Sequence, residues 1–478
     1  MTSLTRVETG VFDPRRFQGV MSTATWDDFS VALDRAGEVF AGRTVWNINS
    51  TGKGGGVAEM LMSLLAYARG ANVDARWLVI EGNPEFFRVT KRIHNHLHGS
   101  PGDGGALGRE EELVYRAALE PNAEALAKLV RPDDIVILHD PQTAGLVPSM
   151  TEVASVAVWR CHVGLDMPNG IARHAWAFLE PFVEPAAAHI FSRREFAWEG
   201  LAPDKTVIVP PSIDAFSPKN QELDSQTVAA ILTATGLIAS GDPNLATFVR
   251  TGGQPGIVRT ATELADGGPP PPPGSRVVTQ VSRWDRLKDP LGVMLGFSEF
   301  VAPHSDAHLV LAGPAVEAVS DDPEGAEVLE EVRSAHRELP GAVSDRVHLA
   351  CLPMDDSEEN AAIVNALQRR SDIVVQKSIA EGFGLTVAEG MWKARPVIAS
   401  RIGGIQDQIV DGVSGVLVDA TDLAGYGEAV KRLLDDPKGA ERMGDEAMER
   451  VRNEFLGPRH LLQYLALLSK LMQEAKRG

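Results

Sequence analysis

The sequence predicts an α/β protein with two doubly wound domains, each built on a parallel sheet. Three observations predict this fold class. Short apolar runs of strand length alternate with segments of helical periodicity along most of the 478 residues. A strand, a Gly-rich loop and a helix follow one another near the N-terminus, which is the opening unit of a doubly wound sheet. A Pro-rich stretch separates two halves that are each long enough to bury a core.

The first domain opens with a strand at 44–48 and the loop 49–56, which reads Asn-Ser-Thr-Gly-Lys-Gly-Gly-Gly. Apolar side chains at helical spacing follow the loop, and Gly70 ends the helix. No Gly-Lys-Ser/Thr closes the loop, so a nucleoside triphosphatase of the P-loop type is disfavoured. Helices are expected at about 26–39 and 83–98, and further strands at 76–80, 135–138, 153–159, 188–192 and 206–209.

The second domain repeats this alternation after residue 276. The pattern predicts a second parallel sheet that is covered by helices on both faces. The expected strands are 277–282, 308–312, 347–350, 373–375, 396–399 and 416–418. The expected helices are 290–302, 324–338, 359–370, 385–394, 422–435 and 438–453.

Residues 216–276 are expected to connect the two domains. This stretch contains five consecutive prolines at 269–273, which favour polyproline II and cannot donate hydrogen bonds to a sheet. We therefore expect an N-terminal domain over 1–215, a connector with a Pro-rich insertion, and a C-terminal domain over 277–455. The amphipathic segment 456–478 is expected to pack back on the N-terminal domain as a helix.

Composition and charge exclude several classes of protein. Hydrophobic residues make up 44% and charged residues 23% of the chain, as in soluble globular proteins. No apolar run reaches the ~18 residues of a membrane span, and the N-terminus has no signal-peptide pattern. Two cysteines, Cys161 and Cys351, favour a reducing compartment over a disulfide framework. The net charge of −19 disfavours nucleic acid and anionic membranes as partners, so a cytoplasmic protein is expected.

The stretch from Glu381 to Glu389 carries the strongest chemical signal. It follows a strand at 373–375, and Gly382 and Gly384 precede a helix from about residue 385. Glycines at such a turn let a ligand approach the backbone, and the amides of a helix start attract an anion. Two carboxylates remain to bind hydroxyl groups. A sugar nucleotide has both a phosphate and hydroxyl groups.

Arg283 and Lys288 follow another strand of the same domain. An arginine binds a phosphate through two hydrogen bonds, and a lysine adds a compact positive charge. An isolated Arg…Lys pair more often lies in a solvated loop and binds no ligand. Together with 381–389, however, this pair indicates a site for a pyrophosphate leaving group.

The first domain offers polar residues at two strand ends. His139 and Asp140 follow one strand, and His162 follows the next. Ligands of open α/β sheets bind at the carboxyl ends of the strands, so His162 and Asp140 could face the reacting sugars. His139 is expected to turn inward. The histidines at 94, 96 and 98 have no cysteine or carboxylate cluster around them, so a metal site is not expected there.

These elements together resemble the retaining glycosyltransferases of the GT-B fold, family GT4. In that family an E-x7-E element, an Arg…Lys pair and an N-terminal Gly loop share one nucleotide-sugar. Within GT4 the closer resemblance is to the glycosyltransferring trehalose synthases. The strings that carry this resemblance are 49–59, 75–82, 85–91, 139–142, 159–162, 210–214, 280–283 and 376–389.

The resemblance implies two Rossmann-like domains facing across a cleft. It implies transfer of glucose from ADP- or UDP-glucose to glucose by a front-face mechanism, giving α,α-trehalose. Glu381 would contact the donor sugar and Glu389 the ribose. The implied donor-binding residues are Gly55, Gly56, Arg283, Lys288, Glu381, Gly382, Phe383, Gly384, Leu385 and Glu389. The implied catalytic residues are His162, Asp140, Arg283, Lys288 and Glu381, and the acceptor-binding residues are Asp140, Glu81, Lys91 and Asn95. No metal or cofactor is implied, the partners are sugars and sugar nucleotides, and a homodimer is compatible with the pattern.

Other functions stay open. The same fold could use another acceptor, such as a sugar phosphate or a secondary-metabolite aglycone. An epimerase, or a pyridoxal-phosphate phosphorylase with Lys377 or Lys393 as the cofactor lysine, would share the architecture. A sugar-nucleotide sensor or scaffold is the non-enzyme alternative. Lys53, the passage 312–317 and the Pro-rich insertion depart from the family pattern and leave the acceptor and the nucleotide base open.

Overall fold

The chain divides into two compact units. The computed structural model describes residues 4–52, 55–238, 241–265, 269–315 and 323–477. Unit 1 is formed by Met1–Ser212 together with Phe455–Gly478, and unit 2 by Ile213–Glu454. The chain therefore passes from one unit to the other twice. Lys53, part of the passage 312–317 and the glycines at 267 and 268 lie outside the described residues.

Unit 1 contains a seven-stranded sheet in the order β1-β3-β2-β4-β5-β6-β7. All described neighbours are parallel except β1, which pairs antiparallel with β3 at the edge. The sequence did not indicate β1, because three partly exposed residues carry no periodic signal. The strands are β1 (Thr5–Val7), β2 (Thr44–Asn49), β3 (Asp74–Val79), β4 (Ile135–His139), β5 (Val156–Cys161), β6 (Ala188–Phe191) and β7 (Thr206–Ile208). Strand order reverses between β2 and β4, where a doubly wound sheet binds its ligand.

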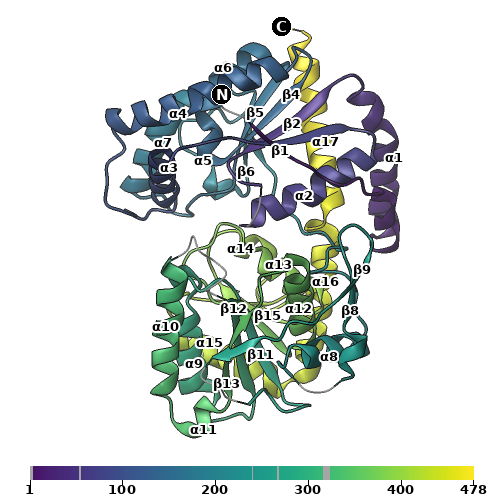
Figure 1. Cartoon of the computed structure of the whole chain (residues 1–478), viewed down its shortest axis with the longest axis vertical. Helices are drawn as coiled ribbons and strands as arrows, with labels where there is room; N and C mark the ends of the chain where they lie inside the picture. The colour runs from purple at the N-terminus through teal and green to yellow at the C-terminus, as the bar shows by residue number, and fades with distance from the viewer. Residues whose placement is uncertain (1–3, 53–54, 239–240, 266–268, 316–322, 478) are drawn as a thin grey trace. The chain divides into compact units, whose positions relative to one another are not determined.

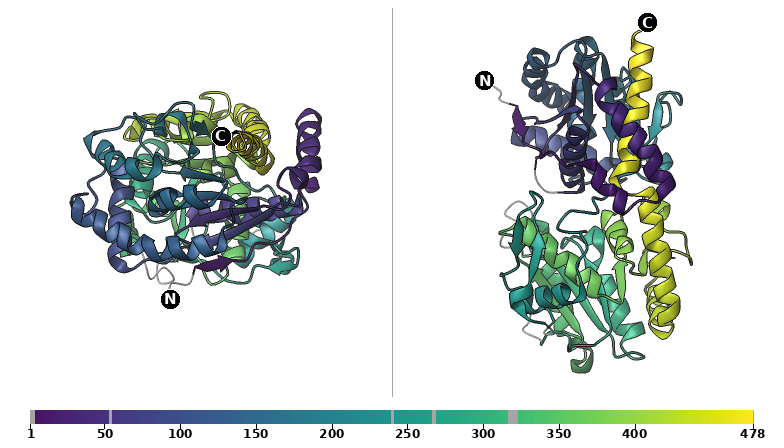
Figure 2. Two further views of the ribbon diagram at one scale, coloured as in Figure 1. Left: turned by 90° about the horizontal axis from the view of Figure 1, so that it is seen from above. Right: turned by 90° about the vertical axis from the view of Figure 1, so that its right-hand side faces the viewer.

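Helices cover both faces of this sheet. Helices α3, α4 and α7 lie on one side, and α1, α2 and α17 lie on the other (Figure 1). Trp46 and Ile48 of β2 point into the first of these layers, whereas Val45 and Asn47 point into the second. Helices α1 and α17 lie side by side although they come from opposite ends of the chain (Figure 2). The helices are α1 (Thr23–Val39), α2 (Gly55–Gly70), α3 (Pro84–Leu97), α4 (Arg109–Leu129), α5 (Asp140–Thr143), α6 (Val147–Val153), α7 (Gly170–Val183) and α17 (Gly457–Ala475).

Unit 2 contains a second seven-stranded sheet, in the order β10-β13-β12-β11-β14-β15-β16. Its described strands are parallel apart from β10 at the edge, and strand order reverses between β11 and β14. The strands are β10 (Glu263–Ala265), β11 (Val277–Val281), β12 (His308–Pro314), β13 (Val347–Leu352), β14 (Ile373–Gln376), β15 (Val397–Ser400) and β16 (Val416–Val418). The helices are α8 (Ser225–Ala234), α9 (Pro290–Gly296), α10 (Pro323–Arg337), α11 (Gly341–Ser344), α12 (Ser357–Arg370), α13 (Leu385–Trp392), α14 (Ile405–Gln408), α15 (Leu423–Asp435) and α16 (Pro437–Glu454).

The segment 216–276 differs from the connector expected from the sequence, because it belongs to unit 2. Helix α8 packs on α12, the hairpin β8 (Thr247–Val249) and β9 (Pro255–Ile257) follows it, and β10 joins the sheet. Ile231, Phe248 and Val258 are buried in one apolar cluster with residues of α12. We expected a connector because of the prolines. The proline content gives no information on whether the scattered apolar residues have a partner surface, which α12 provides here.

The carboxylates of α12 hold this segment in place. Arg250 donates to Asp356 at 2.6 Å, and Glu359 accepts from the amides of Arg259 and Thr260 at 2.6 and 2.7 Å. Glu359 is itself buried. The hydrogen bond of Arg250 to Asp356 joins two ionised groups, which makes it stronger than a neutral one. The segment is therefore part of the folded core of unit 2.

Phe248→Ala is expected to destabilise the protein by about 3–4 kcal/mol, because a buried aromatic ring leaves a cavity when it is removed. Phe248 is only 4% exposed, and the guanidinium of Arg250 lies 5.3 Å from the centre of its ring. The free energy of unfolding in urea measures the effect. Leu245→Ala is the control, since Leu245 is 49% exposed in the same segment. Equal effects of the two substitutions would show that the segment does not contribute to the core.

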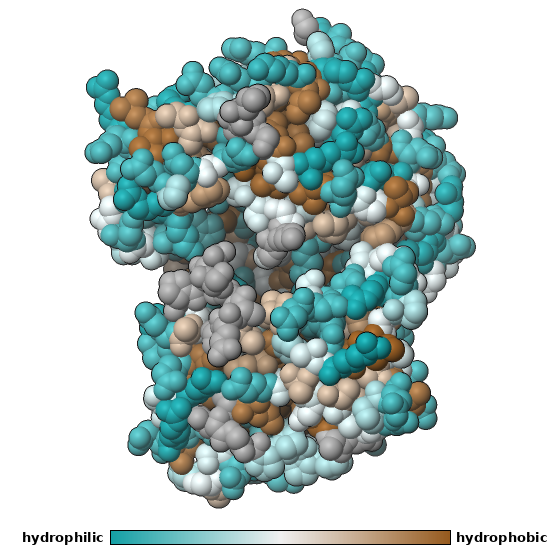
Figure 3. All heavy atoms as spheres, viewed as in Figure 1, coloured by the Kyte–Doolittle hydropathy of each residue, from teal (hydrophilic) through white to brown (hydrophobic). Residues whose placement is uncertain are grey.

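On the face that Figure 3 shows, hydrophobic side chains are scattered among hydrophilic ones. Within the described ranges, the helices are all too short or too polar to cross a membrane.

Candidate active site

The switch point of unit 2 brings together two loops that the sequence had singled out. Residues 282–289 follow β11, and residues 377–384 follow β14. These strands are neighbours at the place where the strand order reverses. The amide of Ile379 donates to the carbonyl of Leu287 at 2.7 Å and so fastens one loop to the other. Ligand-binding groups are expected at this edge of the sheet.

Lys288 and Glu381 form an ion pair at this edge. Lys288 Nζ lies 2.5 Å from Glu381 Oε2, and the two side chains are 18% and 14% exposed. Gln280 holds the lysine backbone in place by donating to the Lys288 carbonyl at 2.9 Å. Lys288 is thus largely buried, although it lies in a loop. Two residues 93 positions apart, each selected for the same ligand, are in contact.

Arg283 lies in the same loop but extends into solvent. Its side chain is 65% exposed, and its Nη2 donates to Asp285 at 2.9 Å. The other oxygen of Asp285 accepts from the amide of Leu287 at 2.8 Å. Asp285 therefore orients both the arginine and the short turn that leads to Lys288. An exposed arginine held in this way remains able to bind an anion.

The start of α13 has the backbone geometry of an anion site. Gly384 precedes the helix with φ +80°, and no side chain caps the helix start. A Cβ on Gly384 would lie 3.0 Å from Ile405, and one on Gly403 would lie 2.0 Å from the carbonyl oxygen of Glu381.

Hydrogen bonds hold the turn before α13 in place. Gln408 stabilises the turn by donating to the Phe383 carbonyl at 2.5 Å. Gly382 contributes its carbonyl to the amide of Gly404, and Leu385 begins the helix. The first amides of the helix can therefore bind a phosphate.

Glu389 lies in the second turn of α13 and is only 4% exposed. Lys219 Nζ is 3.5 Å from its Oε1. Sequence reasoning missed Lys219, because it lies in the segment that we expected to be a connector and no local motif marks it. Its contact with Glu389 exists only because that segment folds onto unit 2.

The two lysines considered for a pyridoxal-phosphate cofactor are both held by protein groups. Lys377 is completely buried and paired with Asp289. Lys393 donates to the side chain of Asn220 and to the carbonyl of Glu389, each at 3.0 Å. Neither amine is presented to a cofactor, so the structure gives no support to a phosphorylase of that type.

In unit 1 the ends of β4 and β5 bring Asp140 and His162 together. Asp140 begins α5 with φ +64°, and its Oδ1 accepts from the amide of His162 at 2.8 Å. Burial raises the pKa of Asp140 to about 6, against the opposing effects of the His162 amide and the positive charge of Arg160. At neutral pH the carboxylate is ionised in a partly buried position, where it is a strong hydrogen-bond acceptor for a hydroxyl group.

His139 and His162 are both neutral. Burial lowers the pKa of His139 to about 3 and takes the pKa of His162 well below its ordinary value, with Arg160 as a smaller cause. His139 Nε2 lies 3.1 Å from Asn47 Oδ1, which can only accept, so this nitrogen carries the hydrogen. His139 Nδ1 then accepts from His162 Nε2 at 3.4 Å, which leaves the lone pair of His162 on Nδ1. His139 is thus inward-facing, as expected, and orients His162.

The remaining candidates lie on the loops and helices around this edge. Gly55 starts α2 with φ +76° and has open space beside it, and Gly56 is exposed next to it. Glu81 is exposed just after β3, where the buried Asn122 bonds both its amide and its carbonyl. Lys91 is exposed and Asn95 partly buried on α3, which packs against α5. The described part of the chain contains no cluster of three His, Cys, Asp or Glu residues suited to a metal ion.

Comparisons with known proteins agree with this chemistry. The family "Trehalose synthase, N-terminal domain" matches residues 47–198, and "Glycosyl transferases group 1" matches residues 265–450. The chain is 36% identical to the trehalose synthase of Pyrococcus horikoshii over 458 residues, covering 96% of this chain and 97% of that one. These matches confirm the resemblance drawn from the sequence motifs.

Solved structures with low identity share the fold. The UDP-forming α,α-trehalose-phosphate synthase of Burkholderia vietnamiensis superposes with a TM-score of 0.64 at 15% identity, over 91% of this chain and all of that one. An Anabaena protein solved in complex with UDP and glucose gives a TM-score of 0.57 at 13% identity, over 90% of this chain and all of that one. Together with the two mostly parallel sheets, these matches confirm the expected GT-B fold class.

Proposed function

Because the chain belongs to the trehalose synthase family of glycosyltransferases, we propose that it transfers glucose from ADP- or UDP-glucose to the anomeric hydroxyl of free glucose. The product would be α,α-trehalose, formed with retention at the donor carbon. The observation that carries the proposal is the ion pair of Lys288 and Glu381 beside the uncapped start of α13. A cation, open backbone amides and a carboxylate at one strand edge match a diphosphate joined to a sugar.

Unit 2 supplies the donor-binding groups in this proposal. The diphosphate binds to Lys288, Arg283 and the first amides of α13, and the loop at Gly55 and Gly56 of unit 1 adds further backbone amides. Glu381 is then released from Lys288 to accept hydrogen bonds from the glucosyl hydroxyls. Glu389 binds the ribose, while Lys219 orients its carboxylate.

Unit 1 supplies the groups for the acceptor. Asp140 accepts a hydrogen bond from an acceptor hydroxyl and orients it for attack. His162 offers its Nδ1 lone pair to a sugar hydroxyl in the tautomer that His139 imposes. Glu81, Lys91 and Asn95 are assigned to the outer acceptor hydroxyls. A neutral histidine is suited to this role because it avoids adding a positive charge beside a developing oxocarbenium ion.

The reaction follows a front-face substitution. The bond from the anomeric carbon to the diphosphate oxygen breaks, and the acceptor oxygen forms its bond on the same face. The acceptor proton moves to the departing phosphate oxygen, whose charge Lys288 and Arg283 stabilise. These cations take the place of a metal ion, so we expect EDTA to leave the rate unchanged.

Product analysis tests the proposal. ADP-glucose and UDP-glucose are each incubated with the protein and with glucose, glucose 6-phosphate or no acceptor. We expect a non-reducing disaccharide that trehalase cleaves, formed with glucose and absent without it. Product formed with glucose 6-phosphate alone would overturn the assigned acceptor. Free glucose released equally with and without acceptor would overturn transfer.

The two glutamates of the 381–389 stretch should differ in their effects. Glu389→Gln is expected to weaken binding of free nucleoside diphosphate about tenfold or more, since the ribose contact is the same in the ground and transition states. Glu381→Gln is expected to lower kcat and to leave free nucleotide affinity little changed, because its contact is with the sugar. Calorimetry of nucleotide binding beside steady-state kinetics measures both. The opposite pattern would exchange the two roles.

A further inference from the structure

A buried arginine links the strand that ends near His162 to the C-terminal helix. Arg160 on β5 is fully buried, and neutral groups hold its guanidinium. Nη1 donates to His460 Nε2 at 2.9 Å and to the Tyr464 hydroxyl, and Nη2 donates to the Val209 carbonyl at 3.1 Å. Among the described residues no carboxylate is hydrogen-bonded to this guanidinium, although the charge of Asp140 is near enough to interact with it. Burying a guanidinium without a hydrogen-bonded carboxylate is unfavourable for stability. An arrangement of this kind therefore suggests a role other than stability.

The hydrogen bonds of His460 have one consistent direction. An arginine can only donate, so His460 Nε2 accepts and its Nδ1 carries the hydrogen. That Nδ1 lies 2.9 Å from Ser212 Oγ and donates to it. Burial, followed by the nearby charge of Arg160, lowers the pKa of His460 far below its ordinary value, so the ring stays neutral. Arg160, His460 and Ser212 thus form a directed chain of hydrogen bonds.

The polypeptide passes between the units at two places, and residues at both places are close to these hydrogen bonds in the sequence. Ser212 is the last residue of unit 1 before the first passage, and the chain returns to unit 1 at Phe455, just before α17 begins. Arg459, in the first turn of α17, donates to the carbonyls of Pro210 and Pro211 at 2.7 and 2.8 Å. The start of α17 therefore joins both passages to β5.

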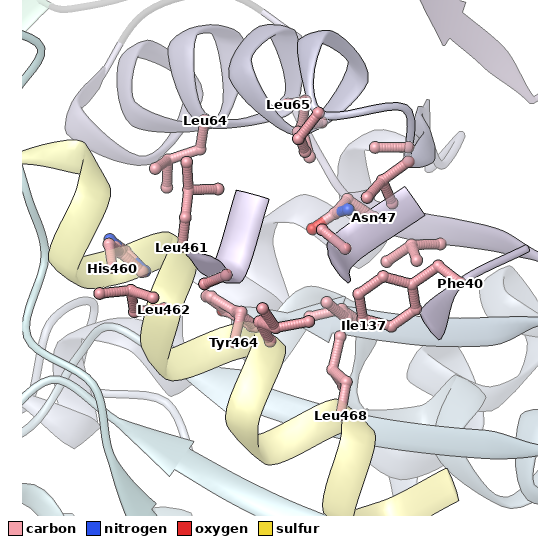
Figure 4. A pocket seen from close by; sticks show the side chains of 18 of the residues that line it. Phe40, Asn47, Leu64, Leu65, Ile137, His460, Leu461, Leu462, Tyr464 and Leu468 are labelled. Carbon is pink, nitrogen blue, oxygen red and sulfur yellow. The ribbon is translucent and has the colours of Figure 1, made fainter. Parts of the chain in front are cut away.

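Hydrogen bonds contribute to the position of α17 in its first turns. A mostly apolar pocket of about 90 Å³ lies between α17, α1, α2 and the sheet. His460 lines this pocket (Figure 4), and Arg160 lines it as well. Leu461 and Leu465 line the same pocket and are only partly buried. Because side chains leave this space unfilled, the hydrogen bonds of His460 and Tyr464 add to the apolar packing of the later turns of α17 in holding the helix against β5.

We propose that Arg160, His460, Tyr464 and Ser212 form a positioning network that ties both chain passages to the end of β5 and so sets the position of His162. His162 follows Arg160 by two residues on the same strand end. The kinetic test below rests on the proposed glucosyl transfer. A displacement of a reacting group by about 1 Å can lower a rate roughly 100-fold, so small shifts of β5 are sufficient.

Four variants test the network by kinetics. Ser212→Ala, Tyr464→Phe and His460→Phe are each expected to lower kcat about 10- to 100-fold. Nucleoside-diphosphate affinity should change less than about twofold, because the proposed ribose and glucosyl contacts and the two phosphate-binding cations are in unit 2. His460→Gln retains an acceptor for Arg160 and a donor for Ser212, and is expected to recover most of the activity lost in His460→Phe. Leu465→Ala, which loosens α17 without touching the network, is the matched control and should keep kcat within about twofold.

A second readout needs no activity. Hydrogen exchange at the amides of 160–163 and 209–212 is expected to accelerate in Ser212→Ala and Tyr464→Phe and not in Leu465→Ala. Unchanged exchange, or a kcat loss in Leu465→Ala equal to that in Ser212→Ala, would overturn the network. If His460→Phe does not fold, the Ser212 and Tyr464 variants decide the question. If the wild-type protein forms no trehalose, the proposed function fails, and hydrogen exchange still decides whether the network exists.

Discussion

Lys288→Met is expected to lower kcat about 100- to 1,000-fold and to leave the protein folded. Methionine keeps the apolar stem of the side chain and removes the charge that would stabilise the departing diphosphate. Lys288 is nearly enclosed beside Glu381, where a charge is screened less by water than on an open loop. Steady-state kinetics with saturating donor measures kcat, and thermal unfolding checks the fold.

Arg286→Met is the matched control for this experiment. Arg286 is two residues away, carries the same charge and bonds Glu331 with its Nη2. The Arg286→Met substitution should lower kcat by less than about twofold. Arg283→Ala should also lower kcat, since Arg283 is assigned to the same diphosphate. Normal rates in both Lys288→Met and Arg283→Ala would remove the pyrophosphate site from this edge of the sheet.

Asp140→Asn is expected to abolish most of the activity and to make the protein more stable at neutral pH. Asparagine tolerates the positive φ of this position and still accepts from the His162 amide. It removes the carboxylate charge, whose burial raises the pKa from 3.8 to about 6. The expected gain in the free energy of unfolding is about 3 kcal/mol at most. Denaturant unfolding at pH 7 beside the rate of disaccharide formation tests both effects.

The sign of the pH dependence follows from the same pKa. The folded state binds the Asp140 proton more tightly than the unfolded state, so this group's contribution to stability falls as pH rises from about 3.8 to about 6. Activity, which needs the ionised carboxylate, should rise with pH through about 6. Asp133→Asn is the control, because Asp133 is exposed close by on the chain. An Asp140→Asn variant that retains full activity would remove Asp140 from the reaction.

Much of the fold could be predicted from the sequence. The strand at 44–48, the Gly loop and the alternation after residue 276 predicted two parallel sheets, because buried parallel strands are short apolar runs between amphipathic helices. The family resemblance selected Lys288 and Glu381 for one ligand, and the structure brings them into contact. The segment 216–276 was misassigned, because its prolines dominate the local pattern while its core contacts lie on α12.

The sequence by itself determined most strands of the two large sheets to within a few residues, the glycine-opened start of α13 and the family, since these depend on local patterns and on the identity of neighbouring residues. The tertiary structure alone decided that Lys219 lies beside Glu389 and that His460 bonds both Arg160 and Ser212. It also decided that Asp140 is buried enough to raise its pKa. Each of these features depends on the packing of segments far apart in the chain. Burial and long-range hydrogen bonds leave no periodic signal in the residues that make them.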